Sequence, residues 1–167
     1  MFPILPLIIV LGVASASFTY FWHDIRDYLN GTFRDFIQKH FGMEWGQYLG
    51  KCLAWLDDGM VSARKGAKKF VDWFRSRVIT IDTTYKKIRP NKATCNRESY
   101  VKCDDGRILH RIEEKEISYD ELPQAIRHEM IRQKTTEAQI DNKKLIEKKI
   151  QERAEEDNFQ ELLVTSF

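Results

Sequence analysis

The first 22 residues constrain the chain more than any other segment, because none of them carries a charged side chain. Eleven of the 22 are Leu, Ile, Val or Phe, and burying these eleven in a bilayer would be favourable by about 3 to 7 kcal/mol. Tyr20, Phe21 and Trp22 end the stretch with aromatic rings, which prefer the boundary between headgroups and hydrocarbon. Residues 1–22 therefore predict a transmembrane helix, with the lipid bilayer as the first expected partner.

A cleaved signal peptide is the competing interpretation of the same stretch. Ala14, Ser15 and Ala16 fit the small-residue pattern of a cleavage site. In that case the chain would be exported, and Cys95 and Cys103 would be the cysteines near enough in sequence for a disulfide. A signal peptide begins with a positively charged region, but no Lys or Arg precedes this apolar stretch. The sequence therefore favours the membrane anchor.

Basic residues beside the expected span predict its orientation. Arg26, Arg34 and Lys39 follow it closely, whereas only the α-amine lies on its N-terminal side. Cytoplasmic flanks are richer in Lys and Arg, so the sequence predicts a single-pass membrane protein whose soluble part is cytoplasmic. The three cysteines agree with a reducing compartment, since they form no recognisable disulfide or metal pattern.

Residues 32–57 read as an amphipathic helix, because apolar residues recur at steps of three and four. Asn30 and Gly31 predict a break just before it. Gly42, Gly46 and Gly50 are spaced four residues apart, which places three positions without a side chain on one helical face. Such a face permits a second helix to approach closely, either from this chain or from a copy of it.

A second amphipathic helix is expected over residues 59–77, and its polar side is basic. The cations of this face are Lys65, Lys68, Lys69 and Arg75. A basic helix close to an anchor suits anionic lipid headgroups, and the same pattern also occurs on a helix packed against its own domain. Nucleic acid is the least favoured partner, because no nucleic-acid-binding motif accompanies the charge.

The pattern changes to strands at Val78. Residues 78–88 alternate and are rich in β-branched side chains, and two further alternating runs flank Asp104-Asp105-Gly106, a turn sequence. Together they predict a small antiparallel sheet. Residues 118–133 carry a capping box and helical periodicity, so we expect this helix to pack on the sheet. Residues 135–140 suit either a strand or a helix, and a charged terminal helix is expected from about residue 142.

The sequence therefore predicts an α+β fold. Its expected segments are a transmembrane anchor (1–22), amphipathic juxtamembrane helices (23–77), a small α+β domain (78–133), and a charged C-terminal helix and tail (134–167).

No residue pattern indicates an enzyme. Metal-ligand spacings, nucleophile–base pairs and phosphate-binding glycine loops are lacking, so we expect no catalytic residue, cofactor or metal. The leading hypothesis is a membrane-anchored scaffold or adaptor subunit that self-associates or joins a larger membrane complex. Two alternatives remain open, namely a ligand-gated membrane effector or sensor with a small binding domain, and the exported protein described above.

Overall fold

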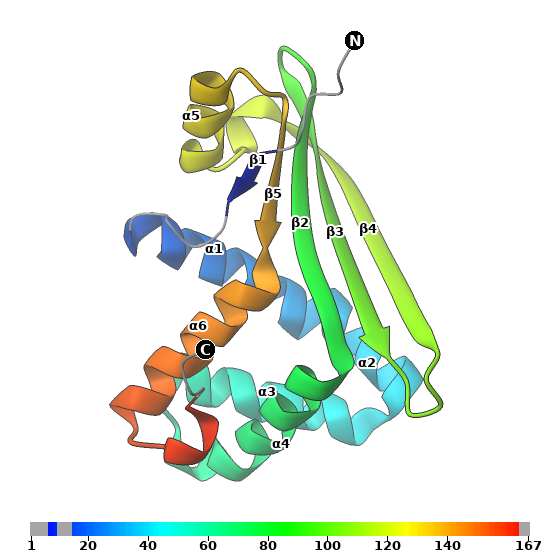
Figure 1. The fold of residues 1–167 in the computed structure, drawn as a ribbon, viewed down its shortest axis with the longest axis vertical. Coiled ribbons are helices and arrows are strands. Elements are labelled where there is room, and N and C mark those ends of the chain that lie inside the picture. Colours follow the sequence, from blue (N-terminus) through cyan, green and yellow to red (C-terminus); the bar gives the residue numbers. More distant parts are fainter. Residues whose placement is uncertain (1–6, 10–14, 164–167) are drawn as a thin grey trace. The chain divides into compact units, whose positions relative to one another are not determined.

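The computed structural model describes the backbone of residues 7–9 and 15–163 (Figure 1) and the side chains of residues 21–163. The predicted α+β class is confirmed. The chain divides into two compact units. The sheet unit comprises Met1–Tyr20 and Ile79–Lys144, and the helical unit comprises Phe21–Val78 and Leu145–Phe167. Each unit is thus built from two separate stretches of sequence.

The helical unit contains helices from both of its stretches. They are the C-terminal part of α1 (Ser15–Tyr28), a π-helical turn (Leu29–Phe33), α2 (Arg34–Phe41), α3 (Met43–Asp58), a 3-10 turn (Val61–Ala63), α4 (Arg64–Arg77), most of α6 (Asn142–Glu156) and a last 3-10 turn (Gln160–Leu162). Large aromatic and aliphatic side chains fill its core: Phe33, Leu49, Trp55, Leu56, Phe70, Phe74 and Ile150 are at most 2% exposed.

The break in the first helical segment lies at Gly42 rather than at Asn30 and Gly31. The chain passes through residues 29–33 as a π-helical turn, so helix continues from α1 into α2. Gly42 ends α2 with φ 105°, a conformation that L side chains rarely adopt. A glycine at this position therefore lets the chain turn sharply between α2 and α3.

The glycine-bearing face of α3 packs within the chain. A Cβ at Gly46 would overlap the side chain of Gln38, and one at Gly50 would lie against the guanidinium of Arg34. Both neighbours belong to the segment Arg34–Phe41, which forms α2. On the other side, α4 approaches α3 through Gly66, where a Cβ would overlap Lys51. Small residues thus allow the close helix contacts of this unit.

The sheet unit holds five described strands in the order β1-β5-β2-β3-β4 (Figure 1). They are β1 (Leu7–Ile9), β2 (Val78–Arg89), β3 (Lys92–Lys102), β4 (Ile108–Ser118) and β5 (Glu137–Asp141), with α5 (Gln124–Gln133) beside β1 and β5. The β5–β2 and β3–β4 pairs are antiparallel and the short β1 is parallel to β5. The expected antiparallel sheet is present, and residues 135–140, left open by the sequence, contribute β5.

The transmembrane expectation for residues 1–22 is wrong. Residues 7–9 form a strand and residues from Ser15 begin a helix, so the apolar stretch is not one continuous helix. Within the described part of the chain no helix is both long and apolar enough to cross a membrane. Phe21 and Trp22 are buried in the helical unit, at 4% and 3% exposure, because the aromatic end serves as core. Residues 1–6 and 10–14, and the Tyr20 side chain, lie outside what is described.

The disulfide expected for an exported chain is also wrong. Cys95 lies within β3 and Cys103 directly follows it, and neither forms a disulfide. Eight residues of extended chain separate them by about 26 Å, whereas bridged cysteines need Cα atoms within about 7 Å. Proximity in sequence does not bring two cysteines together when both lie along one strand.

Gly66→Leu should destabilise the helical unit, because the new side chain would force α4 away from Lys51 on α3. We expect a loss of about 1 to 3 kcal/mol in the free energy of unfolding, typical of overpacking. Thermal unfolding followed by circular dichroism would measure it. Gly31→Ala is the matched control, since its Cβ would meet nothing within 4 Å. Equal melting temperatures for Gly66→Leu and the unaltered chain would contradict the close packing.

Candidate functional site

The hairpin of β3 and β4 is the longest regular feature of the sheet unit. Eleven residues of each strand pair in one uninterrupted register, from Lys92 opposite Ser118 to Lys102 opposite Ile108. Gly106 takes φ 88° in the connecting turn, and Asp105 accepts hydrogen bonds from the main chain and side chain of Arg107. The sequence Asp-Asp-Gly thus forms the turn that the pattern predicted.

β4 is an edge strand. It pairs with β3 on one side and stands last in the sheet order, and no other described strand reaches its outer side (Figure 1). An antiparallel strand directs the N–H and C=O groups of every second residue to each neighbour. Half of the main-chain groups of β4 therefore point to this outer edge, which we call the β4 edge and define as residues 108–118.

The ladder shows which residues point outward. At one end the N–H of Cys103 donates to the carbonyl of Arg107, and at the other the N–H of Tyr119 donates to Asn91. Hydrogen-bonded pairs therefore fall on the odd-numbered residues of β4. The even-numbered residues occupy the pairs without mutual bonds, so their main-chain groups face the outer edge. These residues are Ile108, His110, Ile112, Glu114, Glu116 and Ser118.

The even-numbered side chains lie on the exposed face of the hairpin. Ile108 is 58% exposed and Ile112 is 48% exposed. His110 stacks on Tyr100 with ring centroids 4.2 Å apart, and its Nε2 lies 2.8 Å from Glu98 Oε1. The close stacking agrees with the shorter separation of a pair without main-chain bonds. Two large aliphatic side chains thus remain in solvent on a strand whose outer main chain is unpaired by any described strand.

The odd-numbered side chains of β4 lie on the opposite, less exposed face. Arg111 stands opposite Ser99 and Glu113 opposite Arg97. The Oε2 atom of Glu113 is buried and has no hydrogen-bond partner among the described residues. A buried carboxylate oxygen without a donor costs free energy, and this atom has no donor within the part of the chain that the structure describes. Glu113 itself lies in the edge strand β4.

The helical unit carries a second surface feature, an open groove of about 550 Å³ between α3 and α4. Its lining residues are Glu44, Trp45, Tyr48, Lys69, Asp72, Trp73, Ser76 and Arg77. Trp45 and Trp73 stack on each other with centroids 5.6 Å apart, and Lys69 lies over the ring of Tyr48. The rings therefore already contact one another and a cation, and both signs of charge surround them.

The predicted helix-packing residues separate in the structure. Gly46 and Gly50 face α2, while Gly42 occupies the turn between the two helices. The predicted membrane-surface cations also separate: Lys68 pairs with Asp72 at 2.6 Å, and Arg75 with Glu147 at 3.0 Å. Arg75 further donates to the carbonyl of Leu162. Arg75 thus joins parts of its own unit.

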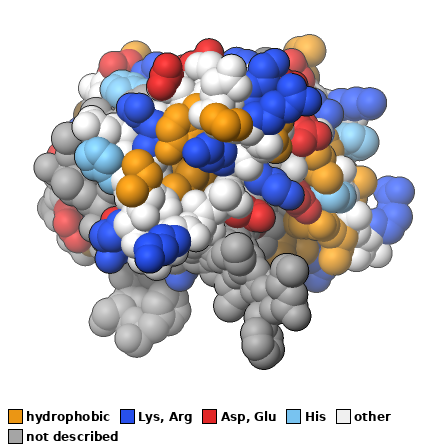
Figure 2. Space-filling view, turned by 90° about the horizontal axis from the view of Figure 1, so that it is seen from above, with side chains coloured by type: hydrophobic (Ala, Val, Ile, Leu, Met, Phe, Trp, Pro, Cys, Tyr) orange, Lys and Arg blue, Asp and Glu red, His pale blue; other side chains and the backbone are white. Residues whose placement is uncertain are grey.

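Lys65 and Lys69, the other two predicted cations, lie on the exposed side of α4. Exposed basic side chains also occur elsewhere. Figure 2 shows Lys and Arg side chains interspersed with hydrophobic and acidic side chains on one face of the molecule. Mixed charges of this kind create no extended field of one sign, so they single out no polyanionic partner.

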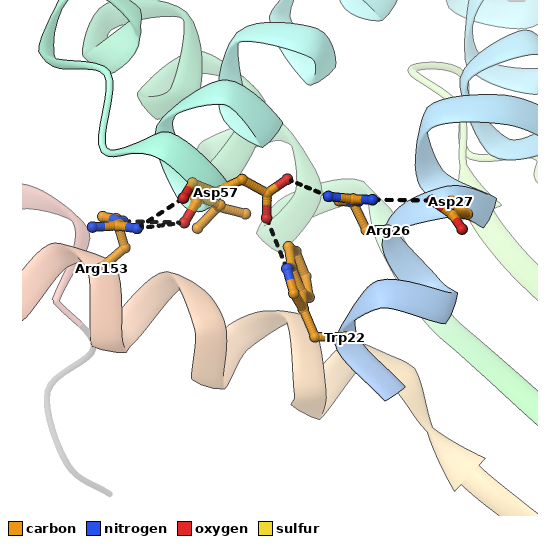
Figure 3. A network of polar contacts seen from close by, with 6 residues as sticks. Trp22, Arg26, Asp27, Asp57 and Arg153 are labelled. Atoms are coloured by element: carbon orange, nitrogen blue, oxygen red, sulfur yellow. Dashed lines mark hydrogen bonds and ion pairs between the residues drawn. The ribbon is translucent and has the colours of Figure 1, made fainter. Parts of the chain in front are cut away.

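A network of polar contacts joins the start and the end of the helical unit (Figure 3). The indole N–H of Trp22 donates to Asp57 at 2.8 Å, and Arg26 contacts the other oxygen of that carboxylate at 3.4 Å. Arg153 donates to the carbonyl of Leu56 at 2.8 Å. Trp22, Arg26 and Arg153 thus connect both stretches of the helical unit to the C-terminal end of α3.

Asp157 forms an equivalent junction at the end of α6. It accepts hydrogen bonds from the buried indole of Trp55 and from Arg64, both at 2.7 Å. Phe159 then packs edge-on against Trp55. The hydrogen bond from Arg64, followed by that from Trp55, holds the pKa of Asp157 below its usual value of 3.8. The charged carboxylate therefore fastens the C-terminal segment to α3 and α4.

Acid should weaken this junction. A carboxyl whose pKa is lower in the folded than in the unfolded chain stabilises the fold above the unfolded value, and this contribution is lost as pH falls through the folded value. We therefore expect the melting temperature to fall below about pH 4 by more in the unaltered chain than in Asp157→Asn, which has no charge to lose. Parallel acid titrations of the two melting curves would contradict this role.

The sequence predicted the hairpin that contains β4, but it did not predict that β4 lies at the edge of the sheet. Strand order depends on contacts between residues that are far apart in the chain. The one available signal was the pair Ile108 and Ile112 among charged neighbours.

Within the described residues no group of three or more His, Cys, Asp or Glu side chains could hold a metal ion. No protein-family model, curated protein or solved structure matches the chain.

Proposed function

We propose that this chain is a non-enzymatic association subunit that binds a protein partner by adding the partner's strand to the β4 edge. The observation that carries this proposal is the row of outward main-chain groups on residues 108–118, flanked by exposed Ile108 and Ile112. An unpaired strand edge is a template for another strand, since main-chain hydrogen bonds supply affinity and alternate side chains supply specificity.

The proposal keeps the association part of the scaffold hypothesis and changes the surface that performs it. The glycine face of α3 lies against α2 of the same chain, so this face is already occupied. The β4 edge offers eleven residues, about 36 Å of extended chain at 3.3 Å each. The membrane part of the hypothesis is not retained.

The sensor hypothesis expected its ligand in the small α+β domain from Val78 onward, whereas the groove described above lies in the helical unit. There Trp45 and Trp73 stack on each other, and Tyr48 donates a 2.6 Å hydrogen bond to Glu44. Aromatic and polar groups that already satisfy one another offer less to a ligand than the outward main-chain groups of β4 offer to a strand. The sheet edge is therefore the better supported site.

Ile112→Pro should abolish strand addition while leaving the hairpin intact. Proline removes the outward N–H of residue 112 but no bond to β3, because residue 112 lies in a pair without mutual bonds. The measurement is fluorescence anisotropy of a labelled synthetic peptide with the sequence of residues 108–118, titrated with the full chain. We expect binding to the unaltered chain and a loss of about tenfold or more with Ile112→Pro.

Ile112→Thr is the matched control, since it keeps the main-chain donor and a β-branched side chain. It should bind the peptide nearly as well as the unaltered chain, and a peptide of the same composition in scrambled order should bind neither. Equal peptide affinity for Ile112→Pro and Ile112→Thr would show that the β4 edge does not accept a strand.

A further inference from the structure

We propose that the partner strand at the β4 edge is β4 of a second copy of this chain, paired antiparallel about a two-fold axis at Ile112. This inference rests on the proposed function, because it requires that the edge accepts a strand. It adds the identity of the partner, the register and the symmetry. The two sheets would then join into one continuous sheet across the dimer (Figure 1 shows the edge).

The main chain restricts the registers available to such a pair. Only even-numbered residues of β4 direct their N–H and C=O groups outward. Two copies can therefore bond only where an even-numbered residue faces an even-numbered residue. An axis at Ile112 satisfies this condition, because it sets Ile112 against itself, His110 against Glu114 and Ile108 against Glu116. About ten main-chain hydrogen bonds would form.

The side chains favour this register over the adjacent ones. With the axis at Ile112, Arg111 of each copy lies opposite Glu113 of the other, so two pairs of opposite charge form. His110 of each copy likewise faces Glu114 of the other. The pattern is self-complementary, as an isologous interface requires, since residue i meets residue j and residue j meets residue i.

Neighbouring registers place like charges together. An axis at Glu113 would set Glu113 against itself and Arg111 against Lys115. An axis at Arg111 would set Arg111 against itself, and an axis at Glu114 would set Glu114 against itself. Like charges directly opposite one another destabilise a strand pair. The charge pattern of β4 thus favours the axis at Ile112 over each adjacent position.

Two features of the single chain agree with this arrangement. Among the described residues no hydrogen-bond donor reaches the buried Oε2 atom of Glu113, and in the dimer Arg111 of the second copy would stand opposite residue 113. Ile112 is 48% exposed in the single chain, and the axis would bring two copies of its side chain together. The same two-fold rotation thus sets Arg111 opposite Glu113 and brings the two Ile112 side chains together.

Charge reversal tests the register in the full chain. Arg111→Glu should place Glu against Glu113 of the second copy, and Glu113→Arg should place Arg against Arg111. Each single variant should dimerise about tenfold or more weakly than the unaltered chain. An equimolar mixture of the two variants should regain the dimer as a heterodimer, since both cross-pairs then have opposite charge. Sedimentation velocity gives the dissociation constants, and native mass spectrometry identifies the heterodimer.

Cysteine cross-linking provides a readout that leaves Glu113 and its neighbour Arg97 unaltered. The variants are made in a chain where Cys95 is replaced by Ser. Ile112→Cys should form a disulfide-linked dimer on mild oxidation, because residues facing each other across the axis lie within bridging distance. Ile108→Cys is the control, since it is as exposed but faces residue 116 rather than itself.

The outcomes separate the two proposals. A chain that stays monomeric up to about millimolar concentration, or equal cross-linking of Ile108→Cys and Ile112→Cys, would overturn the two-fold pairing. If the peptide of residues 108–118 still binds, strand addition stands and only the second-copy partner fails. A dimer that persists in Ile112→Pro would place the interface elsewhere and overturn the two-fold pairing, while the peptide titration decides strand addition separately.

Discussion

The hydrogen-bond ladder between β3 and β4 determines which main-chain groups of the sheet edge remain open to another strand. Because an antiparallel strand bonds to each neighbour through alternate residues, a register fixed at Cys103 and Arg107 also fixes which groups remain outside. The outward set includes Ile112, while Arg111 and Glu113 point their main chain inward. The outward main-chain groups and the charges of Arg111 and Glu113 therefore both favour a symmetry axis at Ile112.

Charged and polar groups play two different parts in the two units. In the helical unit, Asp57 and Asp157 each accept from a buried indole and a guanidinium, so the carboxylates are satisfied inside the chain. In the sheet unit, the buried Glu113 Oε2 lacks a donor among the described residues. Satisfied networks stabilise the fold, and the proposed dimer would set Arg111 of the second copy opposite Glu113.

The error over residues 1–22 shows how apolar sequence misleads. Hydropathy indicates that a side chain is buried away from water, but it does not distinguish burial in a bilayer from burial in a protein core. Trp22 is 3% exposed, and its indole N–H donates to Asp57 from α3, 35 residues away. No local pattern could reveal that acceptor. The glycines of α3 gave the opposite lesson, because their spacing did mark a close helix contact, although it lies within the chain.

The sequence by itself determined the local elements. Alternation predicted the strands from Val78 onward and Asp-Asp-Gly predicted the hairpin turn, because these signals depend only on neighbouring residues. The predicted capping box was wrong, since the Ser118 side chain caps no helix and α5 begins only at Gln124. Only the tertiary structure decided that β4 lies at the edge, that Glu137–Asp141 form β5, and that each unit combines two distant stretches of the chain. Strand order and burial arise from contacts between residues that are distant in sequence, and the local periodicity of a segment does not predict those contacts.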